Sequence, residues 1–163
     1  MLSISYALLC LLVTGFILTF AIVVMPGIAK LEDKDFLKAF QVTDGIIQGN
    51  QPLFLFIWLG SVISVLATMV SAVIIPEFKD AWLIICVGGF YLIGVQGLTM
   101  GVPLPLNNRI KDLKIDSLDN ETLRKERLNF EKKWNFYNKI RTGISIVASL
   151  CFLSVASFPG VWA

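Results

Sequence analysis

Gly101-Val102-Pro103-Leu104-Pro105-Leu106-Asn107-Asn108-Arg109 is the stretch that decides how this chain folds. It follows directly on a long apolar run, and it places two prolines, two amides and a guanidinium where that run ends. A proline lacks a backbone N–H and disfavours helix at the residue before it. The apolar helix is therefore predicted to end in an extended turn near Gly101, which presents the polar side chains beyond it at a fixed depth. Amides and charges near hydrocarbon are costly unless they are paired, so this stretch is predicted to have polar partners.

Apolar segments of roughly 20 residues lie on both sides of this stretch, and each is long enough to cross a bilayer as a helix. Backbone polar groups in lipid must be hydrogen-bonded within their own segment, which favours helices over strands. The composition, 56% hydrophobic and 16% charged residues, is that of an integral membrane protein and not of a soluble domain. The predicted spans are about 4–25, 53–75, 81–100 and 140–158, within a single membrane domain of residues 1–163.

The positions of the basic residues predict the topology. Of the 14 lysines and arginines, all but Lys79 lie in the first and third connections. Positively charged connections remain in the cytoplasm, so both termini are predicted to be non-cytoplasmic. The net charge of +2 is therefore explained by topology. A nucleic-acid partner is not predicted, because the sequence has no basic stripe interleaved with aromatic residues.

The first connection is predicted to contain an amphipathic helix of about residues 33–48, ended by Gly49. This pattern is typical of a helix that lies on, or dips into, the cytoplasmic interface. Its apolar stripe consists of Phe36, Phe40, Thr43 and Ile47, and the polar positions beside the stripe are Gln41, Asp44 and Gln48.

A second charged helix begins at an N-cap, Asp119 or Asn120, and is predicted to continue without a break into the fourth span. One face of this helix carries an aromatic ring, an amide, a guanidinium and a hydroxyl toward the membrane. Arg141 lies at or just inside the hydrocarbon boundary, where snorkelling alone could account for it. The residues of this face are Trp134, Asn138, Arg141 and Ser145.

The third span contains Gly97 and Gly101, a GxxxG spacing that lets helix backbones approach closely. This face could pack inside the bundle, or it could contact a second copy or a partner in a membrane complex. Gln96, near the end of the same span, could bond to a neighbouring helix or line a pocket.

Polar groups of the first and third connections lie on the same side of the membrane and can meet there. A bidentate pair of Asp44 with Arg109 or Arg141 is expected, because a carboxylate and a guanidinium near a low-dielectric wall attract each other. The cluster could form a binding site, or it could be a latch that only holds the connections to the bundle. Its members are Gln41, Asp44, Asn107, Asn108, Arg109, Trp134, Asn138 and Arg141.

Metal and haem sites are not predicted in this chain. The sequence has no histidine, and Cys10, Cys86 and Cys151 each lie alone within a span, where cysteine behaves as a small apolar residue. Zinc sites of paired cysteine and histidine, and histidine-ligated haem, need residues that are missing here. The predicted site therefore has no metal and no cofactor.

Several short motifs carry a resemblance to a known family. They are Met25-Pro26-Gly27 followed by Leu31, Phe40-Gln41 to Asp44, Val102 to Asn108, and Phe130-Glu131 to Trp134, Asn138 and Arg141-Thr142. Over nearly its whole length the chain resembles the anthrone oxygenase family of small four-helix membrane proteins, many of them known only as a domain of unknown function. The resemblance implies oxidation of an anthrone to an anthraquinone without a metal: a base removes a proton, the carbanion reduces O2, and donors stabilise the oxyanion. It implies Asp44 as the base, and as the donors Asn107, Asn108, Asn138 and Arg141.

The sequence thus predicts an all-α, up-down-up-down four-helix transmembrane bundle, with an amphipathic cytoplasmic helix and a cytoplasmic extension of the fourth helix. Two functions stay open. The protein could be a cofactor-free oxygenase-like enzyme that acts on a small aromatic or lipophilic substrate. Alternatively, it could be a non-catalytic membrane subunit that binds a lipid, a quinone-like molecule or a partner protein, through the glycine face or the charged helix 121–133. Transport is the weakest prediction, because no span carries a charge at mid-membrane.

Overall fold

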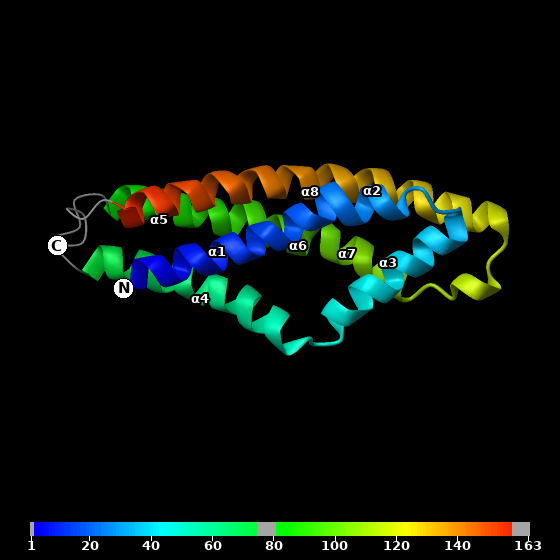
Figure 1. The fold of residues 1–163 in the computed structure, drawn as a ribbon, viewed down its shortest axis with the longest axis horizontal. Coiled ribbons are helices and arrows are strands. Elements are labelled where there is room, and N and C mark those ends of the chain that lie inside the picture. Colours follow the sequence, from blue (N-terminus) through cyan, green and yellow to red (C-terminus); the bar gives the residue numbers. More distant parts are fainter. Residues whose placement is uncertain (1, 75–80, 158–163) are drawn as a thin grey trace.

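A computed structural model describes residues 2–74 and 81–157, and the side chains of residues 7–74 and 81–154. Every regular element in these ranges is helical (Figure 1), which confirms the all-α prediction. Residues 76–80, which join the second and third predicted spans, lie outside the described residues.

Long helical stretches run side by side along the molecule (Figure 1). Two of them contain a π-helical segment, η1 or η2, which continues the helix without a break. The first stretch consists of α1 (Leu2–Thr19), η1 (Phe20–Val24) and α2 (Met25–Ile28), and α3 (Asp33–Gln48) and α4 (Pro52–Ile74) follow it. The elements from α5 to α7 form one continuous path that we call the third stretch: α5 (Ala81–Tyr91), η2 (Leu92–Gly97), α6 (Leu98–Gly101) and α7 (Pro103–Lys111). A short 3-10 helix, η3 (Ile115–Ser117), follows, and the last helix is α8 (Asn120–Ser157).

Three segments of the described chain are apolar and long enough to cross a membrane: Ala7–Ile28, Pro52–Ile74 and Ala81–Lys111. They agree with the first three predicted spans and are consistent with a membrane protein. The fourth predicted span, 140–158, reaches past the described residues and stays a prediction. Within the bundle, α1 packs against α4 and α8, and α5 packs against the same two helices.

The two prolines after the third span do not end the helix in an extended turn, so that prediction is wrong. Only Val102 leaves the helical region, with φ −133° and ψ −62°, and α7 begins at the next residue. Pro103 and Pro105 occupy the first and third positions of α7, where a backbone N–H has no partner within the helix. The chain therefore makes a kink at Val102 and continues as a helix.

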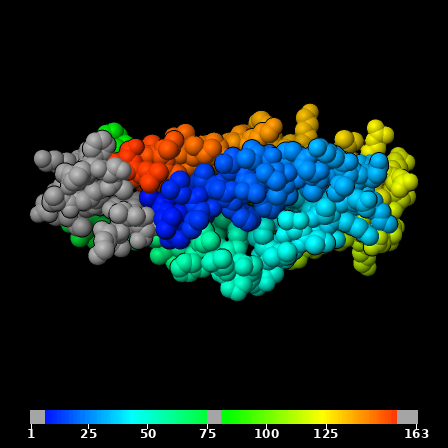
Figure 2. Space-filling view, in the orientation of Figure 1, coloured from blue at the N-terminus to red at the C-terminus, as the bar shows by residue number. Residues whose placement is uncertain are grey.

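The helix predicted at 33–48 is present as α3, and Gly49 follows its last residue as predicted. Its apolar stripe packs on protein, because Phe40 lies with its ring centroid 4.4 Å from that of Phe130 and 5.6 Å from that of Trp134. The connection from α3 to α4 bulges out along one long edge of the molecule (Figure 2).

The N-terminal part of α8 is capped and held by side chains. The Asp119 carboxylate accepts a hydrogen bond from the backbone N–H of Thr122 at 2.7 Å, so Asp119 is the predicted N-cap. Arg127 donates to the carbonyls of Ala29 at 2.7 Å and Leu31 at 2.8 Å, and it pairs with Glu131. These contacts fix the connection between α2 and α3 to α8.

Two glycines of the third stretch allow close helix packing. A Cβ at Gly88 would lie 2.6 Å from the Met69 sulfur, and one at Gly94 would lie 2.7 Å from Cγ2 of Ile144. The predicted GxxxG pair does not serve this packing in the described part of the chain. A Cβ at Gly101 would meet nothing within 4 Å, and one at Gly97 would meet only the carbonyl of Leu92 in its own stretch.

Candidate functional site

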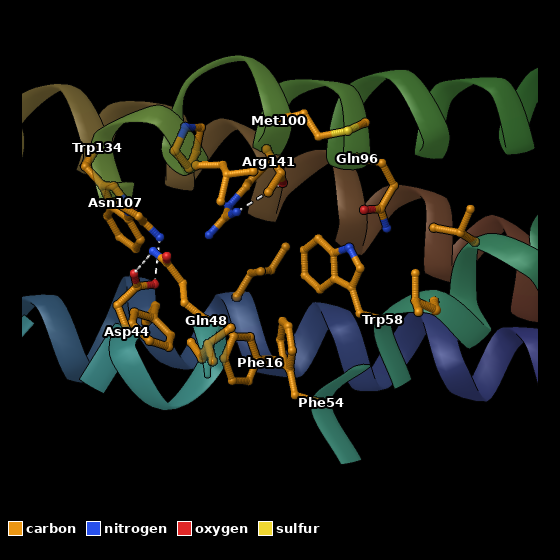
Figure 3. Close-up of a pocket in the computed structure, with 18 of the residues that line it drawn as sticks. Phe16, Asp44, Gln48, Phe54, Trp58, Gln96, Met100, Asn107, Trp134 and Arg141 are labelled. Carbon is orange, nitrogen blue, oxygen red and sulfur yellow. Dashed lines mark hydrogen bonds between the residues drawn. The ribbon is translucent and has the colours of Figure 1, made fainter. Parts of the chain in front are cut away.

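A cavity of about 510 Å³ lies among α1, α3, α4, the third stretch and α8 (Figure 3). This volume is in the range of small-molecule binding sites. Most of the wall is apolar, and the aromatic rings of Phe16, Phe54 and Trp58 lie next to one another along it, with centroids 5.0 Å apart for Phe16 and Phe54 and 5.4 Å apart for Phe54 and Trp58. The polar lining groups gather mainly at one end, around Asp44.

Asp44 is 4% exposed and receives two hydrogen bonds from amides. Its Oδ1 accepts from Asn107 Nδ2 at 2.7 Å, and its Oδ2 accepts from Gln48 Nε2 at 2.5 Å. Asn107 is oriented by Trp134, whose Nε1 donates to Asn107 Oδ1 at 2.7 Å. Because an indole N–H can only donate, Trp134 fixes the Asn107 amide with its NH2 group toward the carboxylate.

Burial raises the pKa of the Asp44 carboxyl above its usual range. The amides of Gln48 and Asn107 and the charges of Lys111 and Arg141 favour the ionised form and offset part of the rise. A carboxylate with a raised pKa is a stronger base than an exposed one. Asp44 is thus equipped to take a proton from a molecule in the cavity.

Arg141, 6% exposed, brings a guanidinium to the same cavity. Its Nε donates to Asn138 Oδ1 at 2.8 Å and its Nη1 donates to Thr99 Oγ1 at 3.1 Å. Asn138 is itself held by a 3.3 Å hydrogen bond to the carbonyl of Ile17. Among the described residues nothing accepts from Nη2, and Figure 3 shows the guanidinium pointing into the cavity. A buried cation with spare donors can stabilise a negative oxygen there.

The predicted pairing of Asp44 with an arginine is not formed. Arg109 instead makes a bidentate ion pair with Glu126, with N–O distances of 2.7 and 2.8 Å, on the exposed surface. Because α7 is a helix, Arg109 projects about 200° around the axis from Asn107 and so faces away from the cavity. Arg141 uses its donors on Asn138 and Thr99 instead of on the carboxylate.

The sequence comparison decides the family. The sequence profile of the anthrone oxygenase family matches residues 51–151. The chain belongs to the anthrone oxygenase family. No curated protein and no solved structure matches it. The match includes Asn107, Trp134 and Arg141 but begins after α3, so it does not cover Asp44.

In this member of the anthrone oxygenase family, only some residues of the predicted polar cluster line the cavity. Asp44, Asn107, Trp134 and Arg141 line it, and Asn138 lies behind Arg141. Asn108 is exposed and lies outside the lining. Gln41 also lies outside, since its Nε2 donates to the carbonyls of Ile110, Lys111 and Leu113 at 2.9 to 3.1 Å and so caps the end of α7.

Other lining residues were not among the predicted site residues. The sequence predicts Gln48 only as a polar position beside the apolar stripe of its helix, and Gln96 as an amide that could bond to a neighbouring helix or line a pocket; both line the cavity. Thr99 lies one helical turn after Gln96, and this i, i+3 spacing is the signal that puts both on one face. The aromatic wall of Phe16, Phe54 and Trp58 gave no such signal, because apolar residues fill every face of a span.

A second cavity of about 340 Å³ adjoins the first. The two share Phe16, Ile47, Phe54 and Trp58, so these side chains form the partition between them. The second cavity is otherwise lined almost entirely by apolar residues of α1, α3 and α4, several of which are exposed on the outside of the bundle.

Proposed function

We propose that this protein is an oxygenase-like membrane enzyme that oxidises a flat, lipophilic substrate of the anthrone type with O2. The observation that carries the proposal is that a buried carboxylate and a buried guanidinium face one aromatic-walled cavity without pairing with each other. Membership of the anthrone oxygenase family supports the reaction class. Fold alone would not, since one fold serves many functions.

The reaction begins when Asp44 takes a proton from the methylene carbon that lies opposite the ketone of the substrate. The negative charge spreads to the ketone oxygen, and Arg141 stabilises it there through its free N–H groups. The carbanion then transfers an electron to O2, and the resulting radical pair combines to form a carbon–oxygen bond and, after protonation, a hydroperoxide. Loss of the second methylene proton and cleavage of the O–O bond give the quinone carbonyl and water. One oxygen atom of O2 enters the quinone and the other leaves as water.

The remaining polar residues position these two groups. Trp134 and Asn107 hold the Asp44 carboxylate, and Asn138 and Thr99 hold the Arg141 guanidinium. The rings of Phe16, Phe54 and Trp58 provide flat apolar surfaces on which a polycyclic substrate can stack.

We further propose that the chain crosses the membrane four times in alternating directions, with both termini non-cytoplasmic and Asp44 near the cytoplasmic end. The basic first and third connections support this orientation. A lipophilic substrate would then reach the site from the bilayer through the second cavity, past Phe54 and Trp58.

The test compares the wild-type protein with Asp44→Asn in lipid nanodiscs supplied with anthrone and O2. We expect quinone formation above the background without protein, and a loss of about 10²-fold or more in Asp44→Asn, as is typical for removal of a general base. Asp35→Asn, an exposed aspartate on the same helix, is the matched control and should keep full activity. Equal rates for the wild type and Asp44→Asn would refute the proposed base. Tight binding of anthraquinone without any turnover would favour the non-catalytic subunit.

A further inference from the structure

Gln96 places a polar group on the cavity wall away from the Asp44 end (Figure 3). Its side chain is 5% exposed and belongs to η2 in the third stretch. The Nε2 of Gln96 donates to Tyr91 Oη at 3.3 Å, and Tyr91 Oη donates to Ser61 Oγ at 3.0 Å. Ser61 Oγ in turn donates to the carbonyl of Trp58 at 2.7 Å.

The direction of this chain fixes the orientation of the Gln96 amide. A backbone carbonyl can only accept, so the single hydroxyl hydrogen of Ser61 is used on Trp58. The hydroxyl hydrogen of Tyr91 is then used on Ser61, and Tyr91 Oη can only accept from the amide. A flipped amide would place Gln96 Oε1 against an oxygen that has no hydrogen left to donate. Nε2 therefore faces Tyr91, and Oε1 faces the cavity.

The Gln96 Oε1 atom lacks a hydrogen-bond donor within the described part of the chain. Figure 3 shows the Trp58 indole on the same side of the cavity, but among the described residues no hydrogen bond joins its N–H to Gln96. Buried acceptors in proteins nearly always have a partner, so an acceptor directed into a ligand-sized cavity indicates a donor on the ligand. The Asp44 end differs, because there the arginine offers donors to an oxygen of the substrate.

We propose that Gln96 is a specificity-determining residue, which accepts a hydrogen bond from a hydroxyl group on a ring remote from the reacting carbon. This inference rests on the proposed function, because it assigns the second polar contact of the same substrate. The hydroxyl chain through Tyr91 and Ser61 holds the amide in place before the substrate binds, so no rotamer has to be ordered on binding. A site built around such a contact discriminates against the analogue that lacks the hydroxyl.

The test measures binding of two quinones that cannot be turned over, anthraquinone and 2-hydroxyanthraquinone, through quenching of tryptophan fluorescence while the phenol is protonated. The wild type should bind the hydroxylated quinone about tenfold more tightly, as expected for one neutral hydrogen bond. Gln96→Met keeps the length of the side chain but removes the acceptor, and it should bind both quinones equally. Its affinity for anthraquinone should match that of the wild type, which controls for folding.

Tyr91→Phe provides a second variant, because it frees the amide to rotate and should reduce the preference while leaving anthraquinone binding intact. Equal affinities of the wild type for the two quinones, or a full preference retained in Gln96→Met, would overturn the role of Gln96 alone. Failure of the wild type to bind either quinone would overturn the proposed function as well.

Discussion

Replacing Asp44 with asparagine or with leucine separates a catalytic base from a structural latch. In Asp44→Asn, the amide of Asn107 still donates to residue 44, because Trp134 fixes its orientation. The Gln48 amide can turn over to accept from the new NH2 group, so both hydrogen bonds survive. The substitution weakens the two hydrogen bonds, because they are no longer charge-assisted, but it also removes the cost of burying a charge. We therefore expect the free energy of unfolding to change by no more than about 1 kcal/mol.

Asp44→Leu leaves the amides of Asn107 and Gln48 without an acceptor in the cavity wall. Each unsatisfied buried group costs about 1–3 kcal/mol, so the two together should destabilise the protein by about 2–6 kcal/mol. Thermal unfolding in mild detergent, followed by intrinsic fluorescence, compares the two variants with the wild type. If Asp44→Asn were as unstable as Asp44→Leu, the charge itself would hold the connections together, and Asp44 would be a structural latch.

The remaining predictions concern pH, the guanidinium and two packing contacts. Because the pKa of Asp44 is raised in the folded protein, the wild type should be most stable relative to Asp44→Asn at acidic pH, where the carboxyl is protonated, and should lose that advantage as pH rises through the raised pKa, measured as the difference in unfolding midpoints. Arg141→Lys keeps the charge but loses the planar donors, and should lower kcat by about 10²-fold while the protein stays folded. Arg127→Met removes the hydrogen bonds to two backbone carbonyls and should lower the free energy of unfolding by about 2–4 kcal/mol. Arg124→Met, at an exposed position of the same helix, is the control and should have almost no effect. Gly94→Ala should cost about 1–3 kcal/mol through its clash with Ile144, whereas Gly89→Ala, with open space around the new Cβ, should be neutral; chemical unfolding curves check both.

Local patterns were sufficient to predict α3 and α8. The stripe containing Phe36 and Phe40 predicted α3 and its two ends, because amphipathic spacing and the glycine after it are local signals. The charged pattern that begins at the Asp119 cap likewise predicted α8 as one continuous helix. Both predictions depend only on residues that are close in the sequence.

The site was harder to predict because it depends on which way side chains point. The rule that proline ends a helix gave an extended turn after Gly101, but it left out the tolerance of proline at the first helical positions. That one error placed Asn107, Asn108 and Arg109 together, whereas the helix directs only Asn107 into the cavity. The free oxygen of Gln96 depends on hydrogen bonds that link its amide in η2 to hydroxyl groups of α5 and α4, and no spacing along the sequence indicates it.

The most direct test of the central claim is to oxidise anthrone with isotopically labelled O2 in nanodiscs that contain the protein. We predict that one labelled atom enters each quinone, one O2 is consumed per quinone formed, and the rate above background disappears in Asp44→Asn. A rate that does not depend on the protein, or a quinone whose new oxygen comes from water, would contradict the account.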